Sequence, residues 1–74
     1  MSDKQVLVTG ACGEIGQALV QGLAKRGGYR IVTADLMPLP DSIKAISAEH
    51  VQGDLVYKIK TFYDHDFDII FHLA

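Results

Sequence analysis

The stretch Val6-Leu-Val-Thr-Gly-Ala-Cys-Gly-Glu-Ile-Gly16 decides how the rest of the chain is organised. It opens with a short apolar run, typical of a strand that is buried on both faces in a parallel sheet. Three glycines with the spacing G-x-x-G-x-x-G follow. We expect Gly10, Gly13 and Gly16 to allow a tight turn, a close approach of backbone to a diphosphate, and close packing of a helix. The free N–H groups and positive dipole end of that helix favour phosphate oxygens.

The surroundings of these glycines decide between an ordinary turn and a dinucleotide site. A dinucleotide-binding turn needs a strand before it, a helix after it and an acidic residue about 20 positions further on. The sequence predicts a strand over Lys4–Thr9 and a helix over Glu14–Arg26, and Asp35 follows a second apolar run, 29–34. The pattern therefore favours a dinucleotide site.

The expected helix has one apolar stripe and a clear end. Lys25 and Arg26 fall in its last turn, where cations oppose the dipole, and Gly27-Gly28 is a stop signal. The stripe that we expect to face a sheet consists of residues at helical spacing, namely Ile15, Ala18, Leu19 and Leu23.

The remaining segments continue the alternation of strands and helices. Two prolines exclude a helix from 36–40, and a short helix capped by Asp41 or Ser42 is expected over 41–46. The later elements are a strand over Glu49–Gln52, a weak helix over 54–63, a polar break at 64–66 and a strand over 67–73, with Ile69, Ile70 and Phe71 in the core. This alternation predicts an α/β fold with a Rossmann-type, doubly wound parallel sheet. We expect about four strands in the order 3-2-1-4.

Composition narrows the classes of partner and compartment. The chain has 74 residues, a net charge of −2 and 49% hydrophobic residues, which is a globular composition. No basic stripe is present to bind nucleic acid, and no apolar run is long enough to cross a membrane. The chain starts without a secretory signal and has only Cys12, so we expect a cytoplasmic protein.

The length fits only part of a doubly wound domain, which uses about six strands in two halves. We expect residues 1–74 to be the N-terminal half of a dinucleotide-binding domain whose remainder, with the substrate-binding part, lies elsewhere. The alternative is a half-domain that assembles through its apolar last strand. A homo-oligomer is expected.

Four landmarks together resemble one family. Thr9-Gly-Ala-Cys-Gly-Glu-Ile-Gly16 resembles the T-G-x-x-G-x-x-G fingerprint of extended short-chain dehydrogenases/reductases, the NAD-dependent epimerase/dehydratase group. Classical short-chain dehydrogenases have T-G-x-x-x-G-x-G instead. The other landmarks are Asp35, Gly53-Asp-Leu55 and Phe71-His-Leu-Ala74, where the family commonly has H-L-A-A. The resemblance covers essentially the whole chain.

The resemblance implies NAD as the cofactor and assigns a place to each landmark. NADP is disfavoured because Asp35 would repel its extra phosphate and no cation occurs at 36–40. The implied NAD-binding residues are Gly10, Gly13 and Gly16 at the pyrophosphate with the Ile15 N–H as a donor, Asp35 at the adenosine ribose, Asp54 and Leu55 at the adenine, and Leu73 and Ala74 beneath the middle of the cofactor. Glu14 and Leu36 are also expected among the cofactor-binding residues.

The implied activity is hydride transfer on a sugar, a nucleotide sugar or a similar hydroxy compound. The family's catalytic pair, Tyr-x-x-x-Lys, is absent, because Thr33, Thr61 and Phe67 follow the three tyrosines at that spacing. No catalytic residue is therefore assigned, and residues 1–74 alone should not turn over substrate. A non-catalytic NAD sensor of the same fold is the alternative.

Five side chains, Cys12, Glu14 and the three histidines, can be interpreted as structural or as functional. Cys12 lies near a helix N-terminus, where thiol pKa values fall, but a small residue filling the turn is favoured over a reactive thiol. Glu14 complements the helix dipole despite its closeness to phosphate. His50, His65 and His72 lack the spacing of a metal site, and His72 is expected to make a structural hydrogen bond below the cofactor rather than transfer a proton.

Overall fold

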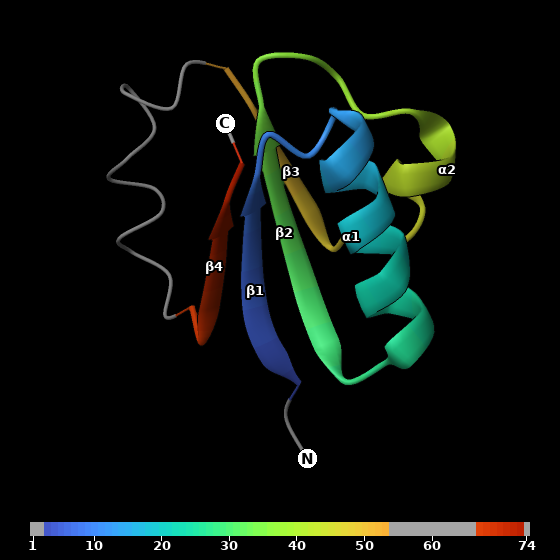
Figure 1. Cartoon of the computed structure of the whole chain (residues 1–74), viewed down its shortest axis with the longest axis vertical. Helices are drawn as coiled ribbons and strands as arrows, with labels where there is room; N and C mark the ends of the chain where they lie inside the picture. The colour runs from blue at the N-terminus through green and yellow to red at the C-terminus, as the bar shows by residue number, and fades with distance from the viewer. Residues whose placement is uncertain (1–2, 54–66, 74) are drawn as a thin grey trace.

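A computed structural model describes residues 3–53 and 67–73. The elements in chain order are β1 (Lys4–Thr9), α1 (Glu14–Arg26), β2 (Tyr29–Asp35), α2 (Asp41–Lys44), β3 (Glu49–Gln52) and β4 (Ile69–His72). The strands form one parallel sheet in the order β3-β2-β1-β4, with α1 and α2 on the same side of it (Figure 1). The predicted fold class and strand order are confirmed.

The register brings the carboxyl ends of all four strands to one edge of the sheet. Thr9 pairs with Ala34 on one side and with His72 on the other, and Asp35 pairs with Gln52. We call this the carboxyl edge. Ligands of open parallel sheets bind outside such an edge, so the register decides where the site lies.

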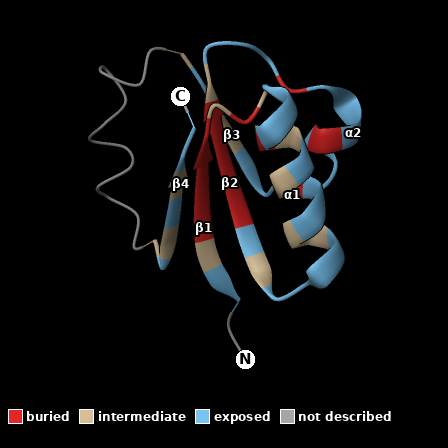
Figure 2. Ribbon diagram, viewed as in Figure 1, coloured by how far each residue is buried: buried red, intermediate tan, exposed pale blue. Residues whose placement is uncertain are grey.

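Burial is concentrated next to this edge. The four residues before the end of β1 and the corresponding residues of β2 are buried, as Figure 2 shows by its red segments. The helix side of the sheet packs against α1 and α2 through Val6, Val8, Ala11, Val20, Ile31, Leu39 and Ile43. A second cluster lies on the opposite face and consists of Leu7, Val32 and Ala34, with Val51 and Phe67 packed against it.

The stripe predicted for α1 is wrong at two positions. Ile15 is 74% exposed and Ala18 is also exposed, whereas Gly16 and Val20 are the buried residues of the helix. Gly16 packs closely on the preceding turn, so the side of α1 that carries Gly16 and Val20 faces the rest of the fold and Ile15 points away from it. Leu19 and Leu23 do pack against the core, as predicted.

The ends of several elements also differ from the prediction. β2 includes Asp35, α2 stops at Lys44 instead of 46 with Pro40 as its N-cap, and β4 covers only Ile69–His72. Ile70 is 59% exposed, so it is not part of a continuous core, while Ile69 and Phe71 are half-buried against the helix side. This alternation is expected in a strand at the edge of a sheet. The predicted helix over 54–63 and break at 64–66 lie outside the described residues.

Candidate dinucleotide site

The turn of residues 10–16, the glycine turn, begins with a left-handed residue at the carboxyl edge. Gly10 has φ 69°, a conformation that side chains disfavour, and its N–H donates to the Ala34 carbonyl at 2.8 Å. The Ala11 N–H reaches the same carbonyl at 3.4 Å. The chain therefore leaves β1 over the end of β2 and enters α1 from there.

Gly13 and Gly16 are glycines for different reasons. A methyl group on Gly16 would clash with the carbonyl oxygen of Gly10 and lie 2.7 Å from the Cα of Ala11, so the fold itself requires glycine there. A methyl group on Gly13 would meet only the Gly10 carbonyl, at 3.5 Å, and the φ of Gly13 is −73°. Nothing in the described protein demands glycine at Gly13, and this leaves room for a ligand.

The start of α1 leaves three backbone donors for that ligand. The N–H of Cys12 binds Asp35, that of Gly13 binds Gly10 at 3.2 Å, and that of Gln17 starts the helical ladder on Gly13 at 2.9 Å. The intervening N–H groups, of Glu14, Ile15 and Gly16, have no helical acceptor, and Gly13 offers no side-chain cap. An uncapped helix start of this kind is an anion site.

A cavity of about 380 Å³ adjoins these donors. Its lining contains the three glycines, both residues between the second and third of them, and one residue after β4: Gly10, Gly13, Glu14, Ile15, Gly16 and Leu73. The exposed Ile15 and Leu73 give it apolar walls, while Glu14 brings a carboxylate to its rim. Six of the predicted NAD-binding residues therefore surround one hollow.

Thr9 fixes the side of the site formed by β4. Its hydroxyl lies 2.8 Å from His72 Nδ1 and accepts the N–H of Leu73 at 3.1 Å. The carbonyl of Thr9 accepts the same N–H at 3.2 Å. His72 thus makes the structural hydrogen bond that was predicted for it, and Leu73 is held beside the glycine turn.

Asp35 ties the second strand to the glycine turn. Its Oδ2 accepts the N–H of Cys12 at 3.0 Å, and its Oδ1 accepts the N–H of Met37 at 3.0 Å. Partial burial raises the pKa of this carboxyl, but the hydrogen bonds from the N–H groups of Met37 and Cys12, with smaller contributions from the nearby Cys12 thiol and Leu36 N–H, outweigh it, so the pKa lies below its ordinary value. Asp35 is an anion at neutral pH, as a ribose-binding residue must be.

The Cys12 thiol is less acidic than its position suggested. Burial and the neighbouring charge of Asp35 raise its pKa, and the single S–H points at the carbonyl of Met37 at 3.2 Å, with that of Pro38 at 3.4 Å beside it. The expected lowering by the helix dipole does not prevail, because burial and the Asp35 carboxylate both disfavour the thiolate. Cys12 fills the turn as a neutral hydrogen-bond donor.

Two residues that the sequence did not place at the site complete it. His50, on β3, donates from Nε2 to the Met37 carbonyl at 3.1 Å, and Gln17 binds the Cys12 carbonyl at 2.8 Å through its side-chain amide. The place of His50 follows from the parallel register of β2 and β3, which sets it opposite Thr33. Leu36, predicted among the cofactor-binding residues, is 65% exposed beside Asp35.

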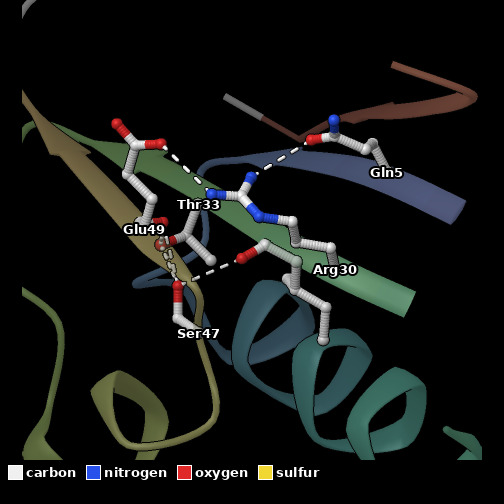
Figure 3. A network of polar contacts seen from close by, with 6 residues as sticks. Gln5, Arg30, Thr33, Ser47 and Glu49 are labelled. Carbon is white, nitrogen blue, oxygen red and sulfur yellow. Dashed lines mark hydrogen bonds and ion pairs between the residues drawn. The ribbon is translucent and has the colours of Figure 1, made fainter. Parts of the chain in front are cut away.

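A larger hollow, about 510 Å³, lies at the opposite edge and is a weaker candidate. It includes the starts of β1 and β2, where Arg30 binds the Gln5 amide oxygen at 3.1 Å and approaches Glu49 at 4.0 Å (Figure 3). No helix begins there, and ligands of parallel sheets bind at the carboxyl edge. These polar side chains satisfy one another on the surface.

Some sequence predictions fall outside what the structure shows. Asp54, Leu55 and Ala74, predicted at the adenine and beneath the cofactor, lie outside the described residues. In residues 3–53 and 67–73, no group of three or more His, Cys, Asp or Glu is arranged to hold a metal ion. None of the helices described there is both long and apolar enough to span a membrane.

Comparison with known proteins agrees with this geometry. The model of the NAD dependent epimerase/dehydratase family matches residues 6–74. The fold is similar to a crystal structure of UDP-glucuronic acid 4-epimerase from Bacillus cereus, a tyrosine-to-phenylalanine variant in complex with UDP-4-deoxy-4-fluoro-glucuronic acid and NAD, with a TM-score of 0.79 and 30% identity. The match covers 95% of this chain and 26% of that protein. No curated protein sequence matches the chain significantly.

Proposed function

Because the chain belongs to the NAD-dependent epimerase/dehydratase family, we propose that residues 1–74 bind NAD as the N-terminal half of a Rossmann domain in a larger enzyme. The observation that carries the proposal is the glycine turn, where none of the described residues requires glycine at Gly13 and Gly13 lies at an uncapped helix start. A pyrophosphate needs both features.

Each part of the cofactor has residues suited to it. The free N–H groups of Glu14, Ile15 and Gly16 would receive the pyrophosphate, and the described residues that line the cavity include no lysine or arginine. Asp35 already accepts two backbone hydrogen bonds, but an ionised carboxylate has about four acceptor sites, so it keeps capacity for ribose hydroxyls. Leu36 presents an exposed apolar side chain next to that carboxylate.

We propose that the larger enzyme acts on a sugar or a nucleotide sugar. NAD, when bound, supplies a hydride acceptor at its nicotinamide ring. The residues described here would bind and orient the cofactor, and we place the acid/base pair that handles substrate protons outside residues 1–74. The support is the family and the UDP-glucuronic acid epimerase, of whose length the chain spans about a quarter.

Calorimetric titration of the protein with NAD and with NADP tests cofactor binding. We expect saturable binding of NAD and weaker binding of NADP, since Asp35 repels the additional phosphate. Equal or tighter binding of NADP would overturn the assignment of Asp35. Turnover of UDP-sugars by the protein encoded by the whole gene tests the substrate class, and NAD binding without turnover of any nucleotide sugar would favour a sensor.

A further inference from the structure

The carbonyl of Met37 is held by donors from two other parts of the fold. His50 Nε2, on β3, lies 3.1 Å from this oxygen, and the Cys12 thiol, in the glycine turn, lies 3.2 Å from it. Met37 belongs to the segment 36–38, which directly follows Asp35 at the carboxyl edge. The segment is therefore fixed from β3 and from the glycine turn together.

A hydrogen bond with Thr33 of β2 fixes the orientation of the His50 ring. Its Nδ1 lies 2.8 Å from the hydroxyl of Thr33, which is fully buried in β2, and the two residues pair in the parallel register. A carbonyl oxygen can only accept a hydrogen bond, so the proton must be on Nε2. In the neutral ring Nδ1 then accepts from the Thr33 hydroxyl, and both nitrogens are used.

The same segment connects back to the acidic residue. The N–H of Met37 donates to Asp35 Oδ1 at 3.0 Å, while its carbonyl accepts from His50. The two backbone groups of Met37 thus link the imidazole to the carboxylate. Hydrogen bonds hold the residues on both sides of Leu36, namely Asp35 and Met37, although the Leu36 side chain is exposed.

We propose that His50 is a positioning residue for the adenosine half of the dinucleotide. It touches no cofactor atom itself. It holds the Met37 carbonyl, and so fixes the segment 36–38 and the rotamer of Asp35 before the ligand arrives. Preorganisation of this kind raises affinity because less ordering remains to be done on binding. The inference rests on the proposed binding of NAD and adds the residue that sets one wall of that site.

Two replacements separate this role from simple packing. The side-chain amide of glutamine reaches about as far as Nε2 of histidine, so His50→Gln can keep the bond to the Met37 carbonyl. His50→Asn is one methylene shorter, which restricts its amide to the vicinity of Thr33. Ser47→Ala is the matched control, because the Ser47 hydroxyl lies 3.1 Å from the same Thr33 hydroxyl but takes no part in the Met37 contact (Figure 3).

The experiment measures affinities of each variant for NAD, for AMP as the adenosine half, and for inorganic pyrophosphate. We expect His50→Asn to weaken NAD and AMP by the same factor, about two- to tenfold as for one lost hydrogen bond, and to leave pyrophosphate unchanged. His50→Gln and Ser47→Ala should stay within about twofold of the wild type, the scatter expected of a neutral change. Urea unfolding of all variants shows whether the fold is intact.

Each outcome bears on the inference in one direction. Equal affinity of His50→Asn and wild type for AMP would overturn it, as would an equal loss for AMP and pyrophosphate, which would indicate general unfolding of the site. Failure of His50→Gln to recover AMP affinity would overturn the role of Nε2. If the wild type binds neither NAD nor AMP, the proposed function fails first, and the two failures are thereby distinguished.

Discussion

The carboxylate of Asp35 accepts a hydrogen bond at 3.0 Å from the backbone N–H of Cys12, so the end of β2 and the glycine turn form one unit. Asp35 therefore holds the glycine turn in place in addition to its proposed role in binding the ribose. The turn needs no ligand to hold its shape, because its N–H groups up to Gly13 are already bound. The donors left over are those at the start of α1.

The Asp35 carboxylate should make the stability of the fold depend on pH in the acid range. The pKa of Asp35 is lower in the folded protein than in the unfolded chain, so its stabilisation is complete above the unfolded pKa and is lost as pH falls through the folded pKa. In Asp35→Asn the free energy of unfolding should therefore decrease less steeply than in the wild type as the pH is lowered below the ordinary pKa of aspartate. Urea midpoints measured across acid pH test this, with exposed Asp41→Asn as the control for a lost charge. An identical acid limb in Asp35→Asn and wild type would contradict it.

The second prediction concerns the reactivity of Cys12. Burial and Asp35 raise the pKa of the thiol, so alkylation by iodoacetamide at neutral pH should be slower than for a cysteine in an unstructured peptide. Asp35→Asn removes the second of these causes and should speed the reaction. A pH profile of the alkylation rate for both proteins checks this. Faster alkylation of the wild type than of the peptide would show that the helix dipole dominates after all.

The third prediction separates two glycines of the turn. Gly16→Ala forces a methyl group against the Gly10 carbonyl and Ala11, and overpacking of this kind costs about 1–3 kcal/mol of unfolding free energy. Gly13→Ala has an ordinary contact and a compatible φ, so stability should change by less than about 1 kcal/mol, while NAD binding weakens. Denaturation and NAD titration of both variants test it. Unimpaired NAD binding by a folded Gly13→Ala protein would contradict the account of the site.

The fourth prediction uses a glycine outside the site. Gly22 lies on the exposed side of α1, and a methyl group there would meet no atom within 4 Å. Gly22→Ala should raise the unfolding free energy by about 1 kcal/mol, since alanine has the higher helix propensity. The same variant should bind NAD as the wild type does, which makes it the matched control for Gly13→Ala. A loss of stability in Gly22→Ala would mean that α1 packs against something on this side.

The sequence predicted the fold well because its signals were local. Apolar runs, a proline pair and the Gly27-Gly28 stop delimit the strands and α1, and the stop is confirmed by Gly27 at φ 78°. The exposure of Ile15 and Ile70 was not predictable in the same way. It depends on how tightly Gly16 packs on the turn and on β4 lying at the edge of the sheet, and both are tertiary facts.

The site was predicted in its parts but not in its connections. The glycine spacing predicted the turn, and the position of Asp35 predicted its acidic partner. The contact of His50 with Met37 requires the register of β2 against β3, which no local pattern states. The direction of the Cys12 pKa shift depends on the burial of the thiol and on a carboxylate 23 positions away in sequence, whereas the helix start that suggested the opposite shift is adjacent.

We propose that NAD binds at the start of α1, and backbone amide NMR during an NAD titration reports on each residue of this site separately. We expect saturable chemical-shift changes that are largest for the N–H groups of Glu14, Ile15 and Gly16. Absence of saturable shifts, or shifts centred on Arg30 and Ser47 at the opposite edge of the sheet, would contradict it.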